Sequence, residues 1–179
     1  MIQLRKAQLS DLPILQHWDQ QAHVLACDPD HDWNWEVELA REPDWRSQLV
    51  AELDGQAIGF LQIIDPALED SHYWGKGIGP NKRAIDIWIG EAENLGKGYG
   101  NQMMHLALEL CFSDASVTEV LIDPLVSNVK AIRFYKRLGF QFLENRDFDG
   151  DECAVYFLTK ARWSRPQRGN SSRLNEPSK

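Results

Sequence analysis

The stretch AIDIWIGEAENLGKGYGNQMMHLALELC, residues 84–111, decides the fold. Its first residues alternate, which predicts a strand with two distinct faces: Ala84, Asp86 and Trp88 on one, and Ile85, Ile87 and Ile89 on the other. Its last residues predict a helix, because apolar side chains recur there at helical spacing: Met103, Leu106, Ala107, Leu110 and Cys111. A strand, a glycine loop and a helix therefore follow one another directly.

The glycine loop, Leu95-Gly96-Lys97-Gly98-Tyr99-Gly100, joins the predicted strand to the predicted helix. Backbone N–H groups at a helix N-terminus are free to hold a pyrophosphate, and glycine lets the backbone approach the anion closely. The loop carries neither the GK[ST] of a Walker motif nor the GxGxxG dinucleotide fingerprint. We therefore expect a phosphate-bearing ligand of another kind.

A second motif follows about thirty residues later. TEVLIDPL, residues 118–125, predicts a buried strand that ends at Pro124, and Ser127-Asn128 comes next. The following segment predicts a helix that stops at Gly139 and carries one apolar stripe: Ala131, Ile132, Tyr135 and Leu138. The two motifs together are far more specific than the glycine loop alone.

This pair of motifs resembles the GNAT N-acetyltransferase family. The family's acetyl-CoA motif Q/R-x-x-G-x-G/A matches Leu95 to Gly100, and its N-x-x-A-x-x-x-Y-x-x-x-G-F matches Asn128 to Phe140. Leu95 departs from the leading Gln or Arg, so a side-chain contact is lost while the backbone can still bind phosphate. The likeness is strong over residues 84–140 and elsewhere extends only to the order of elements.

The resemblance implies acetyl-CoA as the cofactor and a splayed pair of parallel strands that holds its pantetheine arm. Backbone N–H groups from Ile87 to Gly90 would polarise the thioester carbonyl, as in an oxyanion hole. The cofactor-binding residues that it implies are Ile87, Trp88, Ile89, Leu95, Gly96, Lys97, Gly98, Tyr99, Gly100, Asn128, Ala131 and Tyr135.

The remaining elements complete an α+β fold, an α/β sandwich. Residues 2–7 predict a strand, residues 10–24 a helix capped by Ser10 or Asp11, and residues 33–41 a second helix. Asp54-Gly55 is typical of a hairpin turn, residues 66–83 form a long irregular loop, and ECAVYFLTK is the last strand. We expect a mixed, mostly antiparallel central sheet with helices on both faces.

Length and composition set the class of protein. A chain of 179 residues fits one domain, residues 1–163, followed by a disordered basic tail, residues 164–179. The net charge of -8 argues against nucleic acid and favours a cationic substrate. No apolar run spans a membrane and no secretion signal opens the chain, so a cytoplasmic location is expected. The three cysteines have no zinc spacing, so we expect no metal site.

Acetyl transfer to an amine needs a proton acceptor for the amine and a proton donor for the departing thiolate. Tyr135 matches the tyrosine that protonates the coenzyme A sulfur in many family members. For the base we favour Asp86, because a carboxylate inside an apolar strand should face a cleft or a partner. Glu91, directly or through a water, and Glu93 remain rivals.

Residues 84–100 also resemble the GID…LGKGxG stretch of aminoglycoside 6'-N-acetyltransferases, in which Asp86 falls on the proposed base. That resemblance implies a small cationic amine as substrate, with Asp70, Trp74, Asp86 and Asp123 as substrate-binding residues. His72-Tyr73-Trp74 is also similar to the loop histidine of siderophore-type acetyltransferases.

Several alternatives therefore stay open. The acceptor could be a siderophore precursor, a peptide N-terminus or another metabolite, and a non-catalytic coenzyme A-binding sensor is an alternative of another class. The oligomeric state is expected to be monomer or homodimer.

Overall fold

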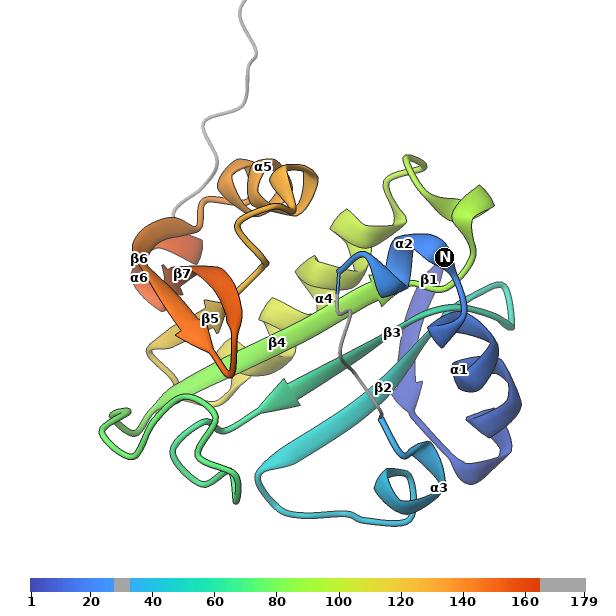
Figure 1. Cartoon of the computed structure of the whole chain (residues 1–179), viewed down its shortest axis with the longest axis horizontal. Coiled ribbons are helices and arrows are strands. Elements are labelled where there is room, and N and C mark those ends of the chain that lie inside the picture. The colour runs from blue at the N-terminus through green and yellow to red at the C-terminus, as the bar shows by residue number, and fades with distance from the viewer. Residues whose placement is uncertain (28–32, 165–179) are drawn as a thin grey trace, which may run out of the picture.

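A computed structural model describes residues 1–27 and 33–164. It contains a seven-stranded sheet in the order β1-β2-β3-β4-β5-β7-β6 (Figure 1). The strands are β1 (Ile2–Lys6), β2 (Arg46–Leu53), β3 (Gln56–Ile64), β4 (Lys82–Ile89), β5 (Glu119–Ile122), β6 (Gln141–Phe148) and β7 (Asp151–Thr159). The helices are η1 (Leu9–Asp11), α1 (Leu12–Asp19), α2 (Ala22–Leu25), α3 (Trp35–Glu38), η2 (Ala92–Asn94), α4 (Tyr99–Ser113), α5 (Val129–Arg137) and α6 (Lys160–Trp163).

The predicted mixed sheet is confirmed. All neighbouring strands are antiparallel except β4 and β5, which are parallel and pair only from Lys82↔Glu119 to Ala84↔Leu121. Beyond that point β4 continues to Ile89 without a β5 partner, so the two strands splay apart. The splay leaves backbone groups of β4 unpaired on one side.

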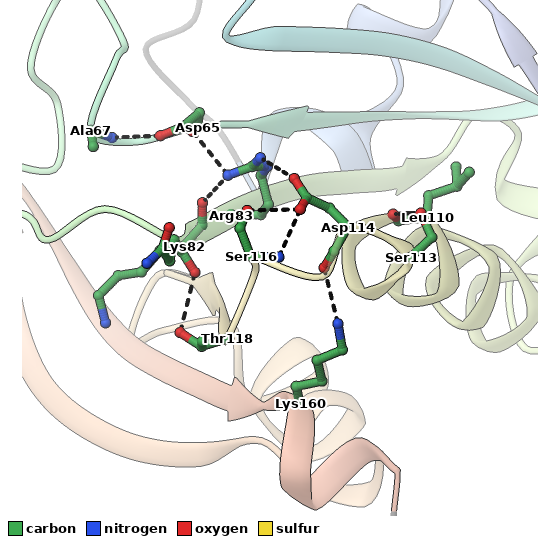
Figure 2. Close-up of polar contacts among 11 residues, drawn as sticks. Asp65, Ala67, Lys82, Arg83, Leu110, Ser113, Asp114, Ser116, Thr118 and Lys160 are labelled. Atoms are coloured by element: carbon green, nitrogen blue, oxygen red, sulfur yellow. Dashed lines mark hydrogen bonds and ion pairs between the residues drawn. The ribbon is translucent and has the colours of Figure 1, made fainter.

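A polar cluster at the opposite end of β4 connects this strand to residues at the ends of β3 and α4 (Figure 2). The Arg83 guanidinium contacts Asp65 Oδ2, at the end of β3, at 2.9 Å and Asp114 Oδ2, at the end of α4, at 3.3 Å. Lys160 Nζ donates to the Asp114 carbonyl at 2.9 Å. At this end β4 and β5 are held together by their backbone pairing and by the ion pair between Lys82 and Glu119, so the opening lies at their carboxyl ends.

Three apolar clusters pack the sheet, and α4 passes behind β4 in Figure 1. The largest lies under α4 and α5 and takes in Ile85 and Ile89 of β4. On the opposite face, α1 and α3 cover the end of β4 around Trp88, while the 65–81 loop covers the end around Ala84. Asp86 lies between these last two clusters, where apolar cover is interrupted.

Most predicted elements are confirmed, with three differences. The predicted helix over 33–41 is only the short α3, which follows Asn34 in the left-handed region at φ 44°. The buried stripe of α4 includes Met104 and Leu108, whereas Leu110, which belongs to the apolar spacing that predicted this helix, is 49% exposed. The predicted helix over 10–24 breaks into α1 and α2. The predicted tail lies outside the described residues, apart from Ser164.

Candidate active site

A pocket of about 330 Å³ opens on the sheet face between the two smaller apolar clusters. Four of its lining residues are acidic, and no Lys or Arg is among the described residues that line it. The lining comprises Cys27, Trp33, Gln62, Ile64, Glu69, Ser71, Tyr73, Trp74, Asp86, Asp123, Leu125, Asp151 and Cys153. Such a pocket suits a ligand with several positive charges.

Asp86 reaches this pocket from the middle of β4. Gln62 lies opposite it in the β3–β4 register, and Gln62 Nε2 donates a hydrogen bond to Asp86 Oδ2 at 2.6 Å. Gln62 is only 6% exposed, and its Oε1 is buried without a hydrogen-bond partner among the described residues. Sequence reasoning missed Gln62, although a polar residue in the apolar run of residues 57–64 was a signal that a cross-strand partner existed.

Asp123, just past the end of β5, is held from the 65–81 loop. The Tyr73 hydroxyl donates to Asp123 Oδ2 at 2.7 Å, and the Tyr73 ring stacks on Phe148 at 4.4 Å. Burial and the neighbouring Asp123 carboxylate raise the pKa of Tyr73, so its hydroxyl stays protonated and remains a donor. Trp74 is 5% exposed and packs on the same Phe148 ring.

The remaining acidic residues of the loop differ in orientation. Glu69 is buried, lines the pocket and accepts hydrogen bonds from the Ser71 hydroxyl and the Tyr73 N–H. Asp70, the residue proposed from the sequence, pairs with Arg41 at 3.2 Å and is absent from the lining, as is His72. Its substrate-binding role stays a prediction, and Glu69 and Asp151 are additional acidic residues that the sequence did not single out.

Tyr135 lies on α5 and is 8% exposed. Burial raises the pKa of its hydroxyl most, and Asp86, Asp123 and Cys27 raise it further through their negative charge. The hydroxyl is therefore protonated at neutral pH, and Tyr135 itself is not among the residues that line the pocket. A protonated phenol can act as a proton donor.

The glycine loop presents unpaired backbone N–H groups. Gly98 is the N-cap of α4 with no side-chain hydrogen bond, and Gly96 and Gly98 have φ values of 74° and 81°. A Cβ at either glycine would meet no atom within 4 Å, so their surroundings are open. Among the described residues, none accepts a hydrogen bond from the N–H groups of residues 96–100. The loop can therefore receive an anion.

The splayed part of β4 adds a second row of backbone groups. Gly90 N–H donates to the Ile58 carbonyl of β3 at 2.9 Å. Since bonding directions alternate along an antiparallel strand, the N–H groups of Ile87 and Ile89 point away from β3, into the splay, while that of Trp88 points toward β3. His23 Nε2 donates to the Ile89 carbonyl at 2.8 Å.

Two other predicted residues have local partners. Asn128 is the N-cap of α5, and its Oδ1 accepts from the Ala131 N–H at 3.1 Å. The rival base Glu91 accepts a hydrogen bond from the Trp18 indole at 3.2 Å and lies 3.1 Å from His17 Nε2. Neither Glu91 nor Glu93 lines the pocket, which favours Asp86 over both.

Comparisons with known proteins agree on one family. A family model described as an acetyltransferase (GNAT) domain matches residues 7–148. The chain is 30% identical to an aminoglycoside N(6')-acetyltransferase type 1 of Serratia marcescens, over 93% of this chain and 87% of the relative. It is 24% identical to the lysine N-acyltransferase MbtK of Mycobacterium tuberculosis, over 87% of this chain and 76% of that relative.

Solved structures give the same result. The crystal structure of aminoglycoside acetyltransferase AAC(6')-Ib in complex with coenzyme A and kanamycin superposes with a TM-score of 0.80 at 27% identity, over 91% of this chain and 97% of that one. The described helices were also compared with the length and hydropathy that a membrane span needs. Within residues 1–27 and 33–164, no helix is both long and apolar enough to cross a membrane.

Proposed function

This chain belongs to the GNAT acetyltransferase family, and on that premise we propose that it moves the acetyl group of acetyl-CoA to a primary amine of an aminoglycoside-like polycation, at its 6'-amine. The observation that carries the proposal is the acidic pocket, whose four carboxylates surround the space in front of β4. A substrate with several ammonium groups would pair with these carboxylates, which are partly shielded from water and so attract it more strongly than exposed charges do.

Acetyl-CoA fits the two rows of unpaired backbone N–H groups. The diphosphate would bind to the loop from Leu95 to Gly100, which includes Lys97 and Tyr99. Gly96 and Gly98 leave room for it, because neither has an atom within 4 Å of the place where a Cβ would lie. The β4 backbone over Ile87, Trp88 and Ile89 receives the pantetheine arm, together with Asn128 and Ala131 at the start of α5. The N–H of Ile87 would stabilise negative charge on the thioester oxygen.

Direct attack of the amine in a ternary complex needs one proton acceptor and one donor. Asp86 accepts the proton of the amine, and Gln62 holds its carboxylate in place through the 2.6 Å hydrogen bond. Tyr135, protonated because burial and nearby carboxylates raise its pKa, donates a proton to the departing sulfur. Asp123, which the Tyr73 hydroxyl holds in place, and the apolar wall of Trp74 orient the rest of the substrate. Asp70 lies outside the pocket lining and pairs with Arg41, so it would contact only a substrate that extends beyond the pocket.

A second acceptor class is a lysine-like amine, favoured by the similarity to the lysine N-acyltransferase MbtK. A lysine side chain carries a single ammonium group, so it would leave most of the acidic pocket uncompensated. We further propose a single domain over residues 1–163 that acts in the cytoplasm as a monomer or homodimer.

A coenzyme A thiol-release assay with kanamycin, ribostamycin, spermidine, lysine and a peptide N-terminus tests this proposal. We expect the aminoglycosides to give the highest kcat/KM, and mass spectrometry of the product to locate the acetyl group on the 6'-amine. Release of the coenzyme A thiol with lysine but with no aminoglycoside would indicate the lysine-like acceptor class. Tight acetyl-CoA binding with no thiol release for any amine would indicate a non-catalytic sensor.

A further inference from the structure

The carboxyl end of β4 is held by side chains from α1 and α2. His23 of α2 donates through Nε2 to the Ile89 carbonyl at 2.8 Å, and Figure 1 shows α2 beside this end of the strand. Trp18 of α1 is fully buried and lies so close to Gly90 that a Cβ at Gly90 would overlap the indole ring. The last residues of the strand are therefore fixed by contacts from outside the sheet.

The Ile89 carbonyl needs such a donor, because it points away from β3. The Gly90 N–H, at the other end of the same peptide unit, donates to the Ile58 carbonyl of β3, and the N–H and carbonyl of a trans peptide unit point in opposite directions. On the far side, β5 pairs with β4 only as far as Ala84, so its strand pairing ends before Ile89. A backbone carbonyl that is buried without a donor costs free energy. His23 thus takes the place of the missing β5 amide.

The peptide unit between Ile89 and Gly90 is bound at both of its polar ends. Its N–H donates to the Ile58 carbonyl at 2.9 Å, and its carbonyl accepts from His23 on the opposite side. Because a peptide unit is planar, two opposed hydrogen bonds fix its orientation. In an extended strand the N–H and the carbonyl of one residue point to the same side, so a fixed Ile89 carbonyl keeps the Ile89 N–H aimed into the splay.

We propose that His23 is a positioning residue of β4, which keeps the Ile89 N–H in place for the pantetheine arm of acetyl-CoA. The inference rests on the proposed function, since that function places the arm along β4. His23 leaves the groove usable, because a carbonyl oxygen has two lone pairs and the Ile89 carbonyl can accept a second hydrogen bond from a ligand. His23 takes no part in the chemistry itself and acts only through the strand.

Two substitutions separate the hydrogen bond from the rest of the side chain. In His23→Gln the amide nitrogen lies about as far from the backbone as the imidazole Nε2, so it can donate to the Ile89 carbonyl. In His23→Asn the side chain is one carbon shorter and its amide stops short of that carbonyl. His23 is only half-buried, so both variants should fold, which their melting temperatures check.

Isothermal titration calorimetry of the full chain with acetyl-CoA tests the proposal. We expect His23→Asn to weaken acetyl-CoA binding about three- to tenfold, the usual net effect of one hydrogen bond, and His23→Gln to stay within about twofold of the parent chain. Leu25→Ala, at an exposed position of the same helix, is the control for a general disturbance of α2 and should also bind as the parent does.

A second ligand distinguishes positioning of the strand from a merely structural role. The nucleotide 3'-phospho-ADP carries the diphosphate of coenzyme A but lacks the pantetheine arm, so the parent chain and His23→Asn should bind it equally well. In steady-state kinetics, His23→Asn should raise the KM for acetyl-CoA and leave the KM for kanamycin within about twofold. Nitrogen NMR of the parent chain, which needs no variant, should show the His23 imidazole protonated at Nε2.

Several results would overturn the assignment of His23 while acetyl transfer by the parent chain still stands. They are an unchanged or tighter acetyl-CoA affinity in His23→Asn, an equal loss of affinity for 3'-phospho-ADP, a loss in His23→Gln as large as in His23→Asn, and an imidazole with no proton on Nε2. Absence of acetyl-CoA binding to the parent chain would instead overturn the proposed function itself.

Discussion

Replacing Asp86 with Asn removes the proposed proton acceptor with little change of shape. The Asn carbonyl can still accept the hydrogen bond that Gln62 Nε2 gives to Asp86 Oδ2 at 2.6 Å, so the strand pair should stay intact. General-base catalysis contributes about 10²–10⁴-fold to rate. Water or buffer can take over part of the role, so we expect kcat to fall at least about tenfold, which corresponds to about 1.4 kcal/mol.

The assay is steady-state kinetics with kanamycin and acetyl-CoA, with cofactor affinity measured by isothermal titration calorimetry. Acetyl-CoA affinity should hold, because Asp86 lies in the acceptor pocket on the opposite face of β4 from Ile87. Glu93→Gln is the matched control: it removes an exposed carboxylate outside the pocket and should leave kcat within about twofold, as distant surface changes usually do. An unchanged kcat for Asp86→Asn would remove Asp86 from the mechanism.

Three further predictions follow from the site and the fold. Tyr135→Phe should lower kcat more than acetyl-CoA affinity, and calorimetry that finds only affinity changed would reassign Tyr135 to binding. Gly98→Ala should raise the acetyl-CoA Kd, measured by calorimetry, about tenfold. The φ of 81° at this position costs an L-residue roughly 1–2 kcal/mol, and the added Cβ would enter the open side of the loop, where the diphosphate is proposed to bind. An unchanged Kd would place the diphosphate elsewhere. Asp11 forms an ion pair with Arg5 at 2.7 Å and accepts a hydrogen bond from the Gln8 N–H at 2.8 Å. Burial opposes ionisation of Asp11, but these two contacts outweigh it and hold its pKa below the usual value, so the stability that they provide is full above about pH 4 and is lost as the pH falls through the lowered pKa. Acid unfolding of Asp11→Asn should show less pH dependence below about pH 4 than the parent chain, and identical profiles would contradict this.

The elements that depend on local sequence were predictable. The Asp54-Gly55 hairpin adopts positive φ at both residues, and the glycine loop begins α4 as its motif indicates. The alternation over residues 84–89 also holds, because burial on both faces of a central strand fixes it. The two turns are specified by neighbouring residues, and the strand is specified by an alternation that the sequence shows directly.

Features that depend on distant pairing were not predictable from one sequence. Nothing in ECAVYFLTK indicates that β7 lies between β5 and β6. The partnership of Gln62 with Asp86 depends on strand register, and the burial of Glu69 depends on how the 65–81 loop folds back on the sheet. The acidic pocket was therefore foreseen only through Trp74, Asp86 and Asp123.

The central claim is that backbone N–H groups of the glycine loop hold the diphosphate of acetyl-CoA while the acidic pocket presents an amine to Asp86. A crystal structure of the chain with coenzyme A and kanamycin tests it most directly. We predict diphosphate oxygens at about 3 Å from the N–H groups of residues 96–100 and the 6'-amine at a similar distance from Asp86. A nucleotide bound elsewhere, or a drug whose amines avoid the pocket carboxylates, would contradict the account.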